Sequence, residues 1–175
     1  MTPSVAEPTN LGADTSTIPS WRDCIRQLEA PGDAFCEHLL RLDQPSLQAR
    51  FGNFVAPAFL AGYASRVDAA NTLLIGCYPD GELRGVAELR SFEPRWADEC
   101  EAAFSVEPAW QGRGIGTALM ARSASEAHRL GVERIHVICD ELNQRMKRMV
   151  SRVGGKLLLV EGECFGTIDV RGRPA

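Results

Sequence analysis

The sequence predicts a single domain of the mixed α/β class. Its 175 residues are 45% hydrophobic and 24% charged, which is ordinary globular usage and is enough for one hydrophobic core. Short runs with the two-residue period of strands are interspersed with longer runs at helical spacing, and no internal repeat interrupts them. The expected element order is β, α, α, β, β, β, α, β, α, β, β.

Residues 1–19 are predicted to form a flexible tail ahead of one domain spanning residues 20–175. They are rich in Pro, Ser, Thr, Gly and Asp, and have too few apolar groups to offset the entropy of ordering. The tail lacks the basic and apolar regions of a signal peptide, and no apolar run is long enough to span a membrane. We therefore expect a soluble, cytoplasmic protein.

The first elements of the domain are a strand and two short helices. Residues 21–28 read as the strand, and the turn at 31–33 leads into a helix whose apolar residues recur at helical spacing. A second helical stretch begins at Pro45. It is divided at Pro57, because proline lacks an amide hydrogen and clashes with the preceding turn.

Three strands are expected next, the first two joined as a hairpin. Residues 72–78 and 83–91 flank the turn Pro79-Asp80-Gly81, and a further strand runs over 98–106. Alternation along this last strand gives it two faces. One face carries Cys100, Ala102, Phe104 and Val106, and the other carries Glu99, Glu101, Ala103 and Ser105.

The second half of the domain begins with the longest helix, over residues 112–130. Gly131 ends this helix, and a buried strand is expected over 134–139. A further helix over 143–153 stops at two glycines, and the closing strands cover 157–160 and 164–170.

Composition excludes several classes of function. A net charge of -4 and a pI near 5.4 argue against a nucleic-acid or anionic-membrane partner, because these are held by clustered Lys and Arg. Six cysteines occur without a C-x-x-C pair and without histidines at zinc-ligand spacing. We therefore expect no metal site and no disulfide framework.

A glycine-rich turn follows the strand at 98–106 and opens the long helix. Its residues are Gln111, Gly112, Arg113, Gly114, Ile115, Gly116 and Thr117. Glycines remove the Cβ atoms that keep an anion away from the backbone, and the N–H groups and dipole of a helix N-terminus favour phosphate. The turn is therefore predicted to bind a pyrophosphate.

Two other phosphate-binding motifs fit this turn less well. A Walker A loop requires a lysine before the Ser or Thr, and Thr117 follows a glycine instead. A dinucleotide fingerprint reads G-x-G-x-x-G directly after a strand, whereas these glycines are spaced G-x-G-x-G and begin several residues after Val106. A glycine-rich helix start without a ligand is the remaining alternative.

The segment Q-G-R-G-I-G resembles the Q/R-x-x-G-x-G/A motif of the GNAT acetyltransferases, and the resemblance covers roughly residues 25–170. It implies the GNAT fold, a mostly antiparallel sheet of six to seven strands with about four helices and splayed strands at the cofactor site. It also implies acetyl-CoA as cosubstrate. The pantetheine arm would then contact the backbone of Phe104, Ser105 and Val106, and residues 111–117 would hold the pyrophosphate.

The helix over 143–153 adds one matching position and one departure. Asn143 corresponds to an asparagine that contacts the cofactor in the family, although an asparagine here is equally suited to be an N-cap. Val150 stands where many members have the tyrosine that protonates the leaving thiolate, and Gly155 replaces an aromatic residue. Because the pKa of a thiol is about 8.5, the thiolate can also leave with help from water or a backbone N–H.

The acceptor of the acetyl group is expected to be a primary amine. Deprotonating a lysine ammonium at pH 7 costs about 4.6 kcal/mol, so a lysine acceptor needs a base. Glu101 is the first candidate, because an ionisable residue in the middle of a strand is hard to explain as core. Glu88 is the second, whereas Glu99 and Glu107 are interpreted as surface charges and the three histidines receive no role.

Residues 100–116 and 38–51 are similar to the catalytic domains of bacterial protein-lysine acetyltransferases, in which a glutamate at the position of Glu101 is catalytic. This resemblance implies a protein lysine as acceptor. The alternatives are a small-molecule amine acetyltransferase and a non-catalytic acyl-CoA-binding regulatory module. The prediction also allows a homodimer.

Overall fold

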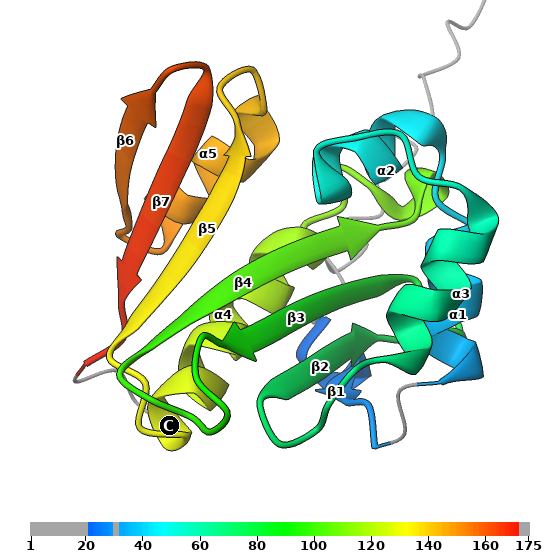
Figure 1. Cartoon of the computed structure of the whole chain (residues 1–175), viewed down its shortest axis with the longest axis horizontal. Helices are drawn as coiled ribbons and strands as arrows, with labels where there is room; N and C mark the ends of the chain where they lie inside the picture. The colour runs from blue at the N-terminus through cyan, green and yellow to red at the C-terminus, as the bar shows by residue number, and fades with distance from the viewer. Residues whose placement is uncertain (1–20, 30–31, 172–175) are drawn as a thin grey trace, which may run out of the picture.

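Figure 1 shows the computed structural model, which describes residues 21–29 and 32–171. The tail predicted over residues 1–19 lies outside these ranges. The strands are β1 (Ile25–Gln27), β2 (Thr72–Cys77), β3 (Gly85–Ser91), β4 (Glu99–Val106), β5 (Arg134–Asp140), β6 (Lys156–Val160) and β7 (Glu163–Asp169). The α-helices are α1 (Asp33–Leu40), α2 (Gln44–Phe51), α3 (Pro57–Ser65), α4 (Ile115–Arg129) and α5 (Gln144–Arg152). Two 3-10 helices, η1 and η2, cover Trp21–Cys24 and Pro108–Trp110.

All the strands belong to one sheet, in the order β1-β2-β3-β4-β5-β7-β6. Every neighbouring pair is antiparallel except β4 and β5. These two parallel strands pair only over Glu99–Glu101 and Arg134–His136, and beyond that point they diverge (Figure 1). The predicted mixed, mostly antiparallel sheet with splayed strands is confirmed.

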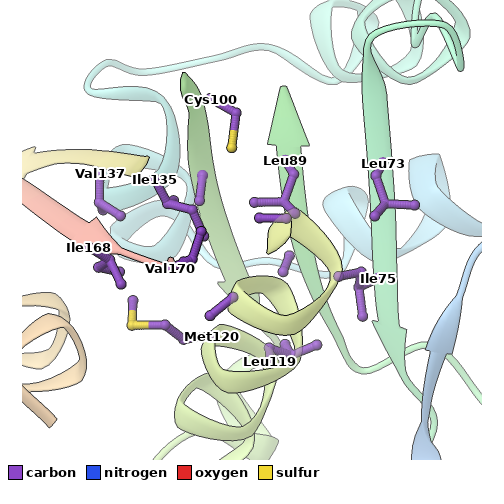
Figure 2. Packing of buried hydrophobic residues seen from close by; sticks show 14 of the residues in the cluster. Leu73, Ile75, Leu89, Cys100, Leu119, Met120, Ile135, Val137, Ile168 and Val170 are labelled. Carbon is purple, nitrogen blue, oxygen red and sulfur yellow. The ribbon is translucent and has the colours of Figure 1, made fainter. Parts of the chain in front are cut away.

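Each face of the first half of the sheet has its own hydrophobic core. On one face α4 packs against Ile75, Ala87 and Leu89, and Figure 2 shows this core continuing to β5 and β7. On the other face α1, α2 and α3 pack against Leu74 and Val86. Because successive strand residues point to opposite faces, a single strand serves both cores.

The helical region between β1 and β2 differs from the prediction, because it contains three helices and raises the number of α-helices from four to five. The Asp43 side chain accepts a hydrogen bond from the Ser46 N–H at 3.0 Å and so starts α2 as a new helix. Gly52, with φ of 75°, ends it in the left-handed region, and Pro57 then begins α3. The first strand is also shorter than expected, because residues 21–24 form η1.

The strand β5, predicted as a buried strand, is buried on one face only. Ile135, Val137 and Cys139 point into the core, but Ile138 is 49% exposed on the opposite face. No helix in the described ranges is long and apolar enough to cross a membrane.

Candidate active site

A cavity of about 550 Å³ lies at the end of β4, where this strand has separated from β5. Its walls come from the start of α2, the end of β4, the glycine-rich turn and α5. All the residues predicted to contact the cofactor line it, except Arg113. A smaller cavity of about 290 Å³ beside β1 and β2 contains none of the predicted site residues.

The glycine-rich turn has the backbone geometry of an anion site. Gly112 and Gly114 have φ values of 75° and 89°, a region that other residues seldom adopt. Gly114 is the N-cap of α4 and has no side chain to accept the first N–H groups of the helix. These N–H groups and the positive end of the helix dipole therefore face the cavity.

Arg113 supports the turn from outside the cavity. Its carbonyl oxygen accepts a hydrogen bond of 2.8 Å from Trp21 Nε1, which joins η1 to the turn. Its guanidinium lies 4.9 Å from the centre of the Trp110 ring, in a cation–π contact. In this arrangement Arg113 holds the shape of the turn and lies outside the cavity wall.

Gln111 connects three walls of the cavity. Its side-chain N–H group donates to Ser46 Oγ and to the Val106 carbonyl, both at 2.9 Å. Its side-chain oxygen accepts from Arg145 of α5. The amide thereby holds α2, β4 and α5 around one opening.

The wall formed by α5 is cationic although the chain as a whole is acidic. Arg145, Arg148 and Arg152 line the cavity. Asp43, the only acidic residue among the described lining residues, is engaged in capping α2. The local charge therefore favours an anionic ligand.

Asn143 lines the cavity and is also the N-cap of α5. Its side-chain oxygen accepts from the Met146 N–H at 3.0 Å. The capping role proposed as an alternative is therefore present. The side-chain N–H₂ group remains for the predicted cofactor contact.

Glu101, the first candidate base, lies where β4 and β5 stop pairing. It is half-buried beside His136 of β5, on the face opposite Phe104. Across residues 21–29 and 32–171, no hydrogen bond or ion pair engages its carboxylate. Glu101 does not line the cavity itself.

Glu88, the second candidate, does not line the cavity. Its carboxylate is 6% exposed and accepts a hydrogen bond of 2.6 Å from Arg50 and one of 2.8 Å from the Tyr63 hydroxyl. These contacts fasten β3 to α2 and α3. Among the described residues, Glu88 is thus engaged by two side chains, whereas Glu101 is engaged by none.

A buried polar network beside the cavity was not predicted from the sequence. His38 of α1 is 0% exposed, and its Nε2 lies 2.8 Å from Ser105 Oγ. Its Nδ1 lies 3.3 Å from a Glu107 carboxylate oxygen. That carboxylate also accepts from Arg41 at 2.7 Å and from Arg84 at 3.0 Å. The interpretation of Glu107 as a surface charge was wrong, because it is only 5% exposed.

Burial and hydrogen bonding set the charges in this network. Burial lowers the pKa of His38 below its usual value of 6.5, although contact with Glu107 acts in the opposite direction. Burial alone would raise the pKa of Glu107, but hydrogen bonds from His38, Arg41 and Arg84 outweigh it and lower the pKa to about 2. At neutral pH the network therefore holds a neutral imidazole beside an ionised carboxylate.

Comparison with known proteins assigns this fold to a family. The sequence pattern of the acetyltransferase (GNAT) family matches residues 36–154. The chain belongs to this family. This membership makes it an acetyl-CoA-dependent acyltransferase, as the sequence predicted. No curated protein sequence matches the chain.

Solved GNAT structures share the fold at low sequence identity. The GNAT domain of PAT from S. lividans is 20% identical, with a TM-score of 0.67 over 83% of this chain and 89% of that one. The yncA protein of Salmonella typhimurium, solved with acetyl-CoA, is 19% identical, with a TM-score of 0.65 over 86% and 95%. A ribosomal-protein-alanine N-acetyltransferase from Brucella melitensis is 17% identical, with a TM-score of 0.66 over 83% and 98%.

Val150, which the sequence resemblance places at the position of the family tyrosine, lies in the core of this GNAT domain. Val150 is 1% exposed and belongs to the α4 core, outside the cavity wall. A Cβ atom at Gly155 would lie 2.5 Å from Val150 Cγ1, and one at Gly166 would lie 3.1 Å from Val150 Cγ2. Val150 and the two glycines therefore fit one another, and position 150 offers no hydroxyl to the cavity.

Proposed function

We propose that this chain transfers the acetyl group of acetyl-CoA to a primary amine. The observation that carries the proposal is the cavity at the β4–β5 divergence, where a helix N-terminus and three arginines of α5 surround one opening. A pyrophosphate with an adjoining phosphate needs this combination of N–H donors and cations.

Different walls of the cavity would bind different parts of acetyl-CoA. The turn from Gly112 to Thr117 would hold the pyrophosphate, and Arg145, Arg148 and Arg152 would neutralise the phosphate charge. The exposed backbone at the end of β4, from Phe104 to Val106, would hold the pantetheine arm, because β5 is not paired with it there. When bound, acetyl-CoA supplies a thioester whose carbonyl carbon accepts the amine.

We propose Glu101 as the base that makes the acceptor amine neutral. It is half-buried, its carboxylate is engaged by no hydrogen bond or ion pair among the described residues, and it is the last residue of β4 that pairs with β5 before the two strands diverge. A carboxylate within reach of the acceptor amine can take its proton as a general base.

We propose a protein lysine as the acceptor. The sheet face that carries Glu101 continues over β5, where Ile138 is exposed, so this approach is an open surface rather than an enclosed pocket. A polypeptide fits such a surface better than a small amine. The name of the Brucella protein likewise gives a protein as its acceptor.

Thermal denaturation with acetyl-CoA, CoA, NAD and ATP, each added separately, tests the cofactor. A ligand at 100 times its Kd adds about 2.7 kcal/mol to stability, and we expect this only for acetyl-CoA and CoA. Arg148→Glu reverses one charge of the cavity wall and should abolish most of the shift. The matched control is Arg95→Glu, which reverses an exposed charge in the loop between β3 and β4 and should keep the shift.

An amine panel then separates the alternatives. Transfer to a lysine peptide supports the protein acceptor, whereas transfer only to a polyamine or aminoglycoside shows a small-molecule enzyme. Cofactor binding without transfer to any amine shows a regulatory module. If acetyl-CoA fails to stabilise the wild type, the proposed function is rejected.

We also propose that two copies associate through β6. This strand is at the edge of the sheet and its five residues are all exposed, with Leu158 at 63% and Leu159 at 57%. An edge strand presents unpaired backbone N–H and C=O groups. Antiparallel pairing of two copies would satisfy these groups and cover the exposed leucines.

A further inference from the structure

Transfer of an acetyl group from a thioester to an amine requires the nitrogen to lose a proton and the sulfur to gain one. Hydroxyl groups that line the cavity are the natural carriers. Among the described residues, these hydroxyls belong to Ser46, Ser105 and Thr117. Ser46 is engaged by Gln111, and Thr117 lies in the turn proposed for the pyrophosphate. Ser105 lies on β4, beside the backbone proposed for the pantetheine arm.

Ser105 is the hydroxyl of this group that contacts an ionisable side chain. Its Oγ lies 2.8 Å from His38 Nε2, and the ring continues through Nδ1 to Glu107 at 3.3 Å. The order is a hydroxyl at the cavity, an imidazole behind it and a carboxylate behind the imidazole. A chain of this kind moves protons because each group is within hydrogen-bond reach of the next.

The surroundings determine which ring nitrogen of His38 carries the proton. Glu107 is ionised and can only accept, so Nδ1 donates to it and Nε2 is left with a free electron pair. Nε2 therefore accepts from the Ser105 hydroxyl. Arg41 and Arg84 hold Glu107 from two sides, which fixes the carboxylate and through it the orientation of the ring.

We propose that Ser105, His38 and Glu107 form a proton relay that carries the proton of the attacking amine to the departing thiolate. This inference rests on the proposed acetyl transfer. Ser105 is the catalytic residue of the relay, whereas His38 and Glu107 act through it.

The relay moves one proton from nitrogen to sulfur and leaves Ser105 and His38 in their starting protonation states. As the nitrogen bonds to the acetyl carbon, its proton passes to Ser105 Oγ while the hydroxyl proton of Ser105 passes to His38 Nε2. The imidazolium is then stabilised by the Glu107 carboxylate. As the carbon–sulfur bond breaks, His38 returns its proton to Ser105, and Ser105 gives a proton to sulfur. The products are the amide and the CoA thiol, and His38 is neutral again.

The relay and Glu101 have separate tasks. Glu101 lies on the same face of β4 as Ser105 but four positions earlier, which is about 13 Å along the strand. Glu101 removes the proton that keeps the free acceptor charged, and the relay moves the second proton from nitrogen to sulfur.

The test compares two thioesters that differ in the acidity of their thiol. With acetyl-CoA and the acceptor found in the amine panel, Ser105→Ala and His38→Gln should each lower kcat about 100-fold, since general acid–base groups contribute at least this much. The Kd for acetyl-CoA should stay unchanged. With S-phenyl thioacetate, whose thiol is far more acidic and leaves without a proton, the ratio of wild-type to variant rates should fall close to one.

Matched variants separate this role from a structural one. Ser105→Thr keeps the hydroxyl and should retain most of the activity. Ser123→Ala removes a buried hydroxyl of α4 that has no hydrogen-bond partner among the described residues, and it should leave both rates unchanged. Glu101→Gln should lose activity equally with both thioesters, because its task precedes departure of the thiol. Thermal unfolding checks that each variant is folded.

Three outcomes overturn the relay while the wild type remains an active acetyltransferase. They are an unchanged kcat in Ser105→Ala, an equal loss with both thioesters, and an acetyl group found covalently on Ser105 by mass spectrometry. The last would make Ser105 a nucleophile. A wild type that transfers acetyl to no amine rejects the proposed function itself, and the relay with it.

Discussion

His38 shows how much a single residue depends on distant parts of the chain. The ring is completely buried, and its two nitrogens contact Ser105 on β4 and Glu107 just beyond it. An unpaired buried nitrogen costs free energy, so these contacts are required whether or not they move protons. Together they attach α1 to the strand that forms the floor of the cavity.

We expect the free energy of unfolding to decrease as the pH falls below about 6.5. The unfolded chain then protonates its histidine, whereas the folded chain resists it because burial lowers the pKa of His38. A second decrease follows between about 4.5 and 2, where the unfolded carboxyl of Glu107 is protonated but the folded one is still ionised. Urea unfolding at a series of pH values measures both decreases.

The variant His38→Gln is the control for this pH dependence. It should flatten the decrease between pH 7 and 5 and leave the more acidic decrease in place. A slope between pH 7 and 5 that is as steep in the variant as in the wild type would assign the effect to another group.

At the scale of single elements, the turn before α4 contains glycines with positive φ values at the proposed phosphate site. Gly112 and Gly131, at the two ends of the α4 region, both have positive φ values, of 75° and 85°, and a Cβ at either meets no atom within 4 Å. A substitution at either position therefore brings the same backbone strain without a clash. The two glycines differ only in what lies beside them.

We expect Gly112→Ala and Gly131→Ala to lose similar stability, about 1 kcal/mol each, from the left-handed backbone conformation. Only Gly112→Ala should weaken acetyl-CoA binding, because it alters the N–H groups that face the cavity. Urea unfolding and calorimetric titration measure the two effects. Equal acetyl-CoA affinity in both variants would remove the turn from the proposed phosphate site.

At the scale of the whole molecule, the cavity is a consequence of how the two parts of the sheet meet. The strands β1–β4 and β5–β7 are joined by one short parallel pairing, and α4 packs across both (Figure 1). The site draws on α2, β4, the turn and α5, which the chain reaches in widely separated segments. At the far edge, β6 leaves its backbone groups open to another copy.

The proposed dimer is tested by placing a charge on β6. Wild type should sediment as a dimer at micromolar concentration, and Leu158→Lys should shift it to monomer, because a lysine on an edge strand opposes pairing. The control Phe54→Lys adds the same charge at an exposed apolar residue outside β6 and should leave the dimer intact. A wild type that stays monomeric at high concentration contradicts the pairing.

The fold and the cofactor turn could be predicted because their signals are local. The glycines at 112, 114 and 116 follow a strand and begin a helix, so the proposed phosphate site consists of nearly consecutive residues. The sequence predicted a break at Pro57 but not that α2 and α3 are separate helices, because a proline marks an interruption without showing that a new helix begins.

The polar network could not be predicted, because its members are far apart in the sequence. His38 and Glu107 are 69 residues apart, and each alone reads as an ordinary surface residue. Only the packing of α1 against the end of β4 brings them together and removes them from water. The interpretation of Glu107 failed for this reason, since burial depends on tertiary contacts that no local pattern records.

The hydrogen bond from Trp21 to the Arg113 carbonyl gives the protein an intrinsic optical reporter. Of its three tryptophans, Trp21 touches the outside of the glycine-rich turn and Trp110 lines the cavity, whereas Trp96 borders the smaller cavity beside β2. An indole responds in emission to changes in polarity and hydrogen bonding around it. A ligand that settles on the turn thus changes the fluorescence of two indoles and leaves the third as an internal reference, without any attached dye.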